Sequence, residues 1–122
     1  MNYNHLMIDA FGCENTEDSD FIKNFLLQSV KVTKMNLITQ PRIKGQKKVV
    51  NPQIFGGSKK LPGITGVAII ETSHISIHTF SDTKKINFDI YSCRHFSNES
   101  VLRHFRKNFS PKKLTIKGCQ RI

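Results

Sequence analysis

Five side chains that can act as nucleophiles or transfer protons lie close together in the second half of the chain. Residues 73–79 read SHISIHT, with two serines and two histidines, and Cys93 follows directly after the next expected strand, residues 85–92. Serine and cysteine supply nucleophiles, and histidine transfers protons near neutral pH. On a half-exposed strand such residues are more often structural, so the residue types alone leave both interpretations open.

A strand expected at residues 73–80 would divide these side chains between two faces. Because successive side chains of a strand alternate, His74, Ser76 and His78 share one face. Ser73 lies on the other face together with isoleucines. Two histidines and a serine thus line one side of the strand.

The surrounding apolar patterns predict the elements that position this strand. We expect further strands at residues 5–11, 35–39, 64–71, 85–92 and 113–119. Helical periodicity predicts one helix over residues 21–32, capped by Asp18, Ser19 or Asp20, and a second over residues 99–108, capped by Ser97 or Asn98. Residues 41–63 are expected to be a long polar loop, within which Val49 and Val50 are the candidates for a short strand.

Helices mixed with antiparallel hairpins predict an α+β fold, a two-layer α/β sandwich with a mainly antiparallel sheet and two helices on one face. The 122 residues leave room for one domain, 1–122. A domain of this size buries a small share of its surface, which favours a homodimer.

The formal net charge of +10 raises the question of a nucleic-acid partner. The basic residues are spread over a central segment, 41–60, and the C-terminal tail, and neither alternates with aromatic residues as a single-strand binding surface does. We interpret them as solvated surface and expect no nucleic-acid partner.

Three cysteines without a CxxC pair indicate neither a disulfide framework nor a zinc site. The N-terminus lacks a targeting pattern, and no apolar run approaches the roughly 20 residues that span a bilayer. We therefore expect a cytoplasmic protein that has no membrane association.

The order of residues at 73–79, followed by Asp89-Ile90-Tyr91-Ser92-Cys93, resembles the prokaryotic S-adenosylmethionine decarboxylase proenzymes, which are self-cleaving and pyruvoyl-dependent. His5-Leu6, Asp9 and Gly12-Cys13 resemble the N-terminal strand of that family. The similarity covers most of the chain except residues 41–60.

The resemblance implies that Ser73 attacks the preceding carbonyl and becomes a pyruvoyl group. Cleavage between Thr72 and Ser73 would yield a β chain, 1–72, and an α chain, 73–122. By the same match His78 promotes the elimination and abstracts a proton, Thr65 assists processing in place of a serine, and Cys93 returns a proton to the α-carbon of the substrate.

A pyruvoyl carbonyl derived from Ser73 would form a Schiff base with a small amino-acid substrate, so the resemblance implies neither a metal nor pyridoxal phosphate. The family's substrate-binding glutamate has a shorter counterpart here, Asp82, within Phe80-Ser81-Asp82. The aromatic residue that stacks on adenine has only one candidate, Phe55.

The implied function is a carboxy-lyase that makes decarboxylated S-adenosylmethionine for spermidine biosynthesis. Because the altered residues concern the substrate pocket, decarboxylation of arginine or ornithine is the first alternative. The second is an unprocessed, catalytically silent relative that binds nucleic acid or protein.

Overall fold

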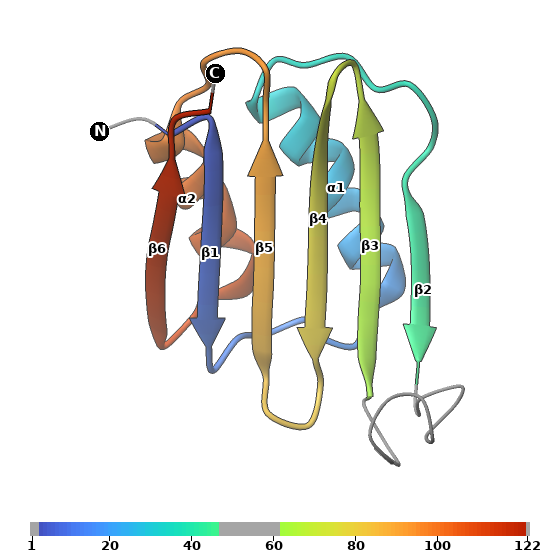
Figure 1. Cartoon of the computed structure of the whole chain (residues 1–122). Coiled ribbons are helices and arrows are strands. Elements are labelled where there is room, and N and C mark those ends of the chain that lie inside the picture. Colours follow the sequence, from blue (N-terminus) through green and yellow to red (C-terminus); the bar gives the residue numbers. More distant parts are fainter. Residues whose placement is uncertain (1–2, 47–61, 122) are drawn as a thin grey trace, which may run out of the picture.

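An antiparallel sheet carries the catalytic candidates in the computed structural model, which describes residues 3–46 and 62–121 (Figure 1). Within these residues the sheet has six strands in the order β2-β3-β4-β5-β1-β6. The strands are β1 (His5–Phe11), β2 (Arg42–Gln46), β3 (Gly63–Ile70), β4 (Ser73–Phe80), β5 (Lys85–Tyr91) and β6 (Lys113–Cys119). β4, which begins at Ser73, lies inside the sheet between β3 and β5.

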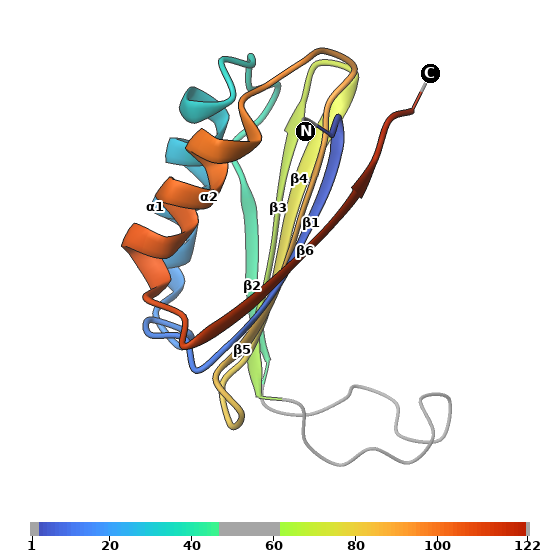
Figure 2. The same ribbon diagram turned by 90° about the vertical axis from the view of Figure 1, so that its left-hand side faces the viewer.

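Two helices, α1 (Ser19–Val32) and α2 (Asn98–Phe109), cover one face of this sheet (Figure 2). Their aromatic side chains pack into the layer between helices and sheet, where Phe25, Phe88, Phe105 and Phe109 are almost fully buried. Phe25 makes edge contacts with Phe88 and Phe109, with ring centroids 5.2 and 4.6 Å apart. The hydrophobic core therefore lies entirely on the helix side of β4 and β5.

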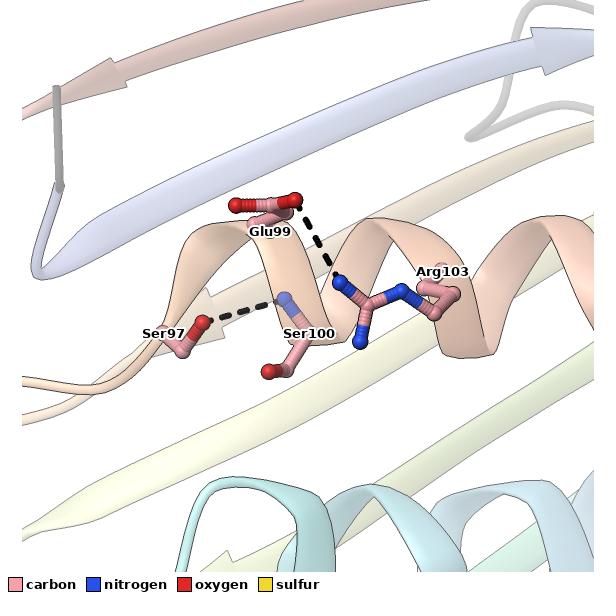
Figure 3. A network of polar contacts seen from close by, with 4 residues as sticks. All are labelled: Ser97, Glu99, Ser100 and Arg103. Carbon is pink, nitrogen blue, oxygen red and sulfur yellow. Dashed lines mark hydrogen bonds and ion pairs between the residues drawn. The ribbon is translucent and has the colours of Figure 1, made fainter.

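Side-chain hydrogen bonds fix where each helix begins. Asp18 accepts a hydrogen bond from the backbone N–H of Phe21 at 3.0 Å at the start of α1. The hydroxyl of Ser97 accepts one from the N–H of Ser100 at 3.1 Å, and Arg103 pairs with Glu99 at 3.3 Å on the first turns of α2 (Figure 3). Such caps satisfy N–H groups that have no partner within the helix.

The other face of the sheet is turned away from α1 and α2, and we call it the open face (Figure 2). In β4 the residues alternate between buried and more accessible positions, beginning with a buried Ser73. The register of the strand pairs assigns the following residues of the inner strands to the open face: His5, Met7, Asp9, Thr65, Val67, Ile69, His74, Ser76, His78, Asn87, Asp89 and Tyr91.

The predicted α+β sandwich with two helices on one face is confirmed, and the strands predicted at 5–11, 73–80 and 113–119 have those bounds. The strand predicted at 35–39 is wrong, because there only Leu37 forms an isolated bridge, to Ile70. The strand next to β3 is β2, inside the expected loop. It is an edge strand with one apolar residue, Ile43, so it lacks the apolar run that marks a strand in a sequence. Val49 and Val50 lie outside the described residues.

Candidate active site

The predicted cleavage position lies at a two-residue turn between β3 and β4. Ile70 pairs with Ser73, so Glu71 and Thr72 form the turn. Thr72 has a φ of 53°, which is unfavourable for a β-branched residue and costs about 1–3 kcal/mol. The N–H of Glu71 donates to the carbonyl of Asn36 at 3.1 Å, which ties the turn to the segment after α1.

Cys93 contacts the residues on both sides of the predicted cleavage position. Its Sγ lies 2.8 Å from Oγ1 of Thr72, and its backbone N–H donates to Oγ of Ser73 at 3.1 Å. The hydroxyl of Thr72 also donates to the carbonyl oxygen of Glu71 at 2.7 Å. β5 pairs with β4 along its whole length, and its register carries the chain to Cys93 beside the β3–β4 turn.

The surroundings of Cys93 favour its thiolate. The hydrogen bond from Thr72 is the largest influence that lowers the pKa of Cys93, followed by the hydrogen bond from Ser73, and the charge of Arg94 acts in the same direction. Cys93 is exposed, so reagents and substrates can reach the sulfur. Cys13 is the opposite case, because burial raises its pKa to about 11.

Thr65 and His78 form a second polar pair, away from Ser73. They are paired across β3 and β4, and Oγ1 of Thr65 lies 3.2 Å from Nδ1 of His78. His78 is five residues beyond Ser73 on β4, about 17 Å along the strand, and on the open face. The two predicted processing residues therefore meet each other, but within one chain they do not meet Ser73.

Asn87, which sequence analysis overlooked, lies on the far side of His78 from Thr65. It pairs with His78 on β4 and with Asp9 on β1. Its Oδ1 is buried and accepts no hydrogen bond from the residues that the structure describes. The length of the β4–β5 loop could have predicted this position of Asn87. A loop of Ser81–Lys84 makes Phe80 and Lys85 partners, and the same register places Asn87 opposite His78.

Of the two predicted substrate-binding residues, the structure describes only Asp82. Asp82 is exposed in the β4–β5 turn, at the opposite end of β4 from Ser73 (Figure 1). Phe55 lies outside the described residues. His74, the neighbour of Ser73, stands on the open face with its ring 5.8 Å from that of Tyr91.

This arrangement provides the groups for an acyl shift and for a proton transfer. A serine hydroxyl adjoins a carbonyl in a strained turn, and an exposed sulfur lies beside both residues of that turn. The Thr65–His78 pair supplies an imidazole whose Nδ1 is occupied, leaving Nε2 for proton transfer.

Comparisons with known proteins identify the family of this chain. S-adenosylmethionine decarboxylase proenzymes from Methanococcus maripaludis strain C5 and Clostridium botulinum strain Langeland are 29% and 28% identical to this chain over 120 residues, 96% of it and 87% and 91% of the relatives. The adenosylmethionine decarboxylase structure from Aquifex aeolicus superimposes with a TM-score of 0.68 at 18% identity, covering 97% of this chain and 90% of that chain. The family model for S-adenosylmethionine decarboxylase matches residues 4–122, and the chain belongs to that family.

Proposed function

We propose that this chain is a self-cleaving, pyruvoyl-dependent S-adenosylmethionine decarboxylase whose product serves spermidine biosynthesis. The observation that carries the proposal is the contact of Cys93 with both Thr72 and Ser73. It joins the residue expected to return a proton to the residue expected to become the cofactor. The relatives named as proenzymes support processing of this chain as well.

Processing is proposed to begin at the hydroxyl of Ser73. Its Oγ attacks the carbonyl carbon of Thr72, the C–N bond breaks, and the amide becomes an ester with a free α-amine. β-Elimination then breaks the Cβ–Oγ bond, so Thr72 leaves as a carboxylate. One water hydrolyses the resulting imine, ammonia departs, and residue 73 carries a pyruvoyl group at the start of chain 73–122.

The surrounding residues fit this sequence of steps. The N–H of Cys93 holds Oγ of Ser73 next to a turn whose Thr72 occupies an unfavourable backbone conformation. His78, supported by Thr65, is proposed to take the α-proton of residue 73 during elimination. A hydroxyl on residue 73 is the only precursor that this chemistry requires, so no separate cofactor has to be bound.

In the mature enzyme the pyruvoyl carbonyl would serve as the electron sink while carbon dioxide leaves an amino-acid substrate. The protein's own part is to return a proton to the α-carbon, and the exposed Sγ of Cys93 is the group proposed for it. Asp82 and Phe55 stay predictions as substrate contacts, and the cytoplasmic location stays a prediction too.

The distance between His78 and Ser73 supports a homodimer. Because His78 lies about 17 Å along β4 from Ser73 and on the open face, one chain alone does not complete the proposed site. A second copy packed against the open face is proposed to bring its own Thr65–His78 pair to the β3–β4 turn of the first, where Ser73 begins β4. It would also cover Ile69, which is half exposed there, and offer partners to the buried Oδ1 of Asn87.

Intact mass measured under denaturing conditions tests processing. Two fragments split between Thr72 and Ser73, with the C-terminal one lighter by one ammonia than hydrolysis predicts, would support the proposal, and Ser73→Ala should stay intact. A wild-type chain that remains whole after long incubation would contradict it. Turnover of S-adenosylmethionine, arginine and ornithine by the cleaved protein identifies the substrate, and activity only on a basic amino acid would transfer the assignment to the alternative.

Complementation tests the dimer. If His78 acts on the Ser73 of its partner, co-expression of Ser73→Ala with His78→Ala lets the His78→Ala chain be cleaved, although each variant alone stays whole. No cleavage in the mixed sample, with both variants folded and associated, would exclude action across the dimer.

A further inference from the structure

Cleavage at the β3–β4 turn would create a new chain end beside Cys93. Before cleavage Oγ1 of Thr72 lies 2.8 Å from Sγ of Cys93. The residue before it is held in place, because the N–H of Glu71 donates to the carbonyl of Asn36, and Ile70 is the last residue of β3. Thr72 is one residue beyond this anchor, so its carboxylate carbon after cleavage stays within about 5 Å of the Cα of Glu71.

We propose that the carboxylate formed at Thr72 by processing remains beside Cys93 and keeps that sulfur protonated, which makes Thr72 a positioning residue for the proton-returning step. The inference rests on the proposed self-cleavage. The elimination that breaks the Cβ–Oγ bond of Ser73 puts one full negative charge on Thr72, where the intact peptide bond carried none. A nearby negative charge disfavours a second one on sulfur.

Processing also removes one of the groups that now stabilise the thiolate. Oγ of Ser73, one of the two side-chain hydrogen-bond partners of Cys93, leaves residue 73 during processing. The single hydroxyl hydrogen of Thr72 is shared between the carbonyl of Glu71 and Cys93, and the new carboxylate offers it a third acceptor. Cleavage therefore shifts Cys93 from surroundings that suit a thiolate to surroundings that suit a thiol, the form that can give a proton.

Other charged groups near Cys93 are the same before and after cleavage. Arg94 follows it in the chain and favours the thiolate. Lys34, in the segment after α1, and His95 line the same cavity as Arg94. Glu71 contributes the acidic side chain of the β3–β4 turn, exposed to solvent. The carboxylate of Thr72 is the only charge that cleavage adds between these groups.

Thiol alkylation with iodoacetamide, read site by site by peptide mass spectrometry, tests the proposal. Ser73→Ala is the matched uncut protein, because it and the processed enzyme both lack the hydroxyl at residue 73. They differ in the charge of the Thr72 carboxylate and in the uncharged ketone of the pyruvoyl group. The thiolate is the reacting form, so at pH 7 Cys93 should react about 3- to 10-fold more slowly in the processed enzyme. Its pH titration should move to higher pH, and 1 M salt should reduce the difference because the charges are exposed.

Cys119 supplies the internal control, since it is exposed on β6 and should react equally in both proteins. Thr72→Val, which removes the hydroxyl and keeps the carboxylate, should still show the slower reaction after cleavage. Equal alkylation of Cys93 in fully processed enzyme and Ser73→Ala would overturn the inference and leave self-cleavage intact. A wild-type chain that is never cut would overturn both.

Discussion

Thr65 and His78 face each other across β3 and β4, with Oγ1 and Nδ1 3.2 Å apart, on the sheet face that Ser73 does not share. Both belong to strands inside the sheet, whose backbones are held by neighbours on each side. The imidazole of His78 is therefore oriented by one hydroxyl. Its Nε2, the nitrogen left for proton transfer, points away from Thr65. This geometry makes the threonine a positioning residue for proton transfer.

Removal of the Thr65 hydroxyl should slow self-cleavage. Thr65→Val keeps the shape of the side chain but releases Nδ1 of His78, and we expect processing to slow by about 10- to 100-fold, part of what an oriented acid or base contributes. Thr65→Ser should process at least as fast as the wild type. The rate is measured by following the intact chain on denaturing gels.

Thr115→Val is the control for this series. Thr115 is an exposed threonine in β6, in the same row across the sheet as Thr65, and its replacement should leave the rate unchanged. Processing of Thr65→Val at the wild-type rate would show that His78 needs no support from this hydroxyl.

Replacement of Cys93 should separate processing from turnover. Cys93→Ala keeps the backbone N–H that donates to Oγ of Ser73, so cleavage should proceed. Without the sulfur the proton has no donor, and turnover should fall by about 100-fold or more. Cleavage is followed by intact mass and turnover by release of carbon dioxide, with Cys119→Ala as a control that retains both. Full turnover by Cys93→Ala would remove Cys93 from the proton-returning step.

Much of this site was predictable from strand patterns, because the strands that carry it alternate cleanly. A two-residue turn at Glu71–Thr72 sets a register in which Thr65 must oppose His78, and both residues are visible in the sequence. Counting residues from the turn of the β4–β5 hairpin in the same way places Asn87 opposite His78. These partners follow from turn length, which register depends on.

Two features were beyond such reasoning. The edge strand β2 has a polar sequence, because its one neighbour, β3, supplies the hydrogen bonds and only Ile43 has to be buried. The contact of Thr72 with Cys93 depends on a positive φ at Thr72, and a β-branched residue is a poor predictor of that conformation. Both reflect tertiary contacts that outweigh local preference.

Thr79 should be a structural threonine whose loss destabilises the sheet. Its buried hydroxyl accepts from the N–H of Ile64 at 2.9 Å and donates to the carbonyl of Thr16 at 2.7 Å. Thr79→Val leaves the N–H of Ile64 without its partner, while Thr16 keeps a bond from Ser81. We expect a loss of about 2–3 kcal/mol in the free energy of unfolding.

Urea denaturation in the uncut Ser73→Ala background measures this loss without interference from processing. Thr115→Val, at an exposed position, should change the free energy of unfolding by less than about 0.5 kcal/mol. Equal stability of the two valine variants would mean that the two hydrogen bonds of Thr79 add nothing to the free energy of unfolding.

His104 should make the fold sensitive to acid. It stacks on Phe25 with ring centroids 4.5 Å apart, and its nitrogens contact Ser29 at 3.1 Å and Asn108 at 3.2 Å. Burial lowers the pKa of His104, and the charge of Lys107 acts in the same direction. Basic side chains from both helices and from the segment after α1 line the same cavity: Lys31, Lys34, Arg103 and Lys107.

An unfolded histidine takes up its proton near pH 6.5. Folded His104 is still neutral at that pH, because its pKa is lowered. As the pH falls below about 6.5, the unfolded chain therefore binds the proton that the folded chain does not, and the free energy of unfolding decreases. Above that pH, His104 is neutral in both states and does not make the free energy of unfolding depend on pH. Urea denaturation of Ser73→Ala between pH 5 and 8 should show this decrease, and His104→Gln should flatten it. His95→Gln, at an exposed position, should retain the wild-type profile, and an unchanged slope in His104→Gln would assign the acid sensitivity to another group.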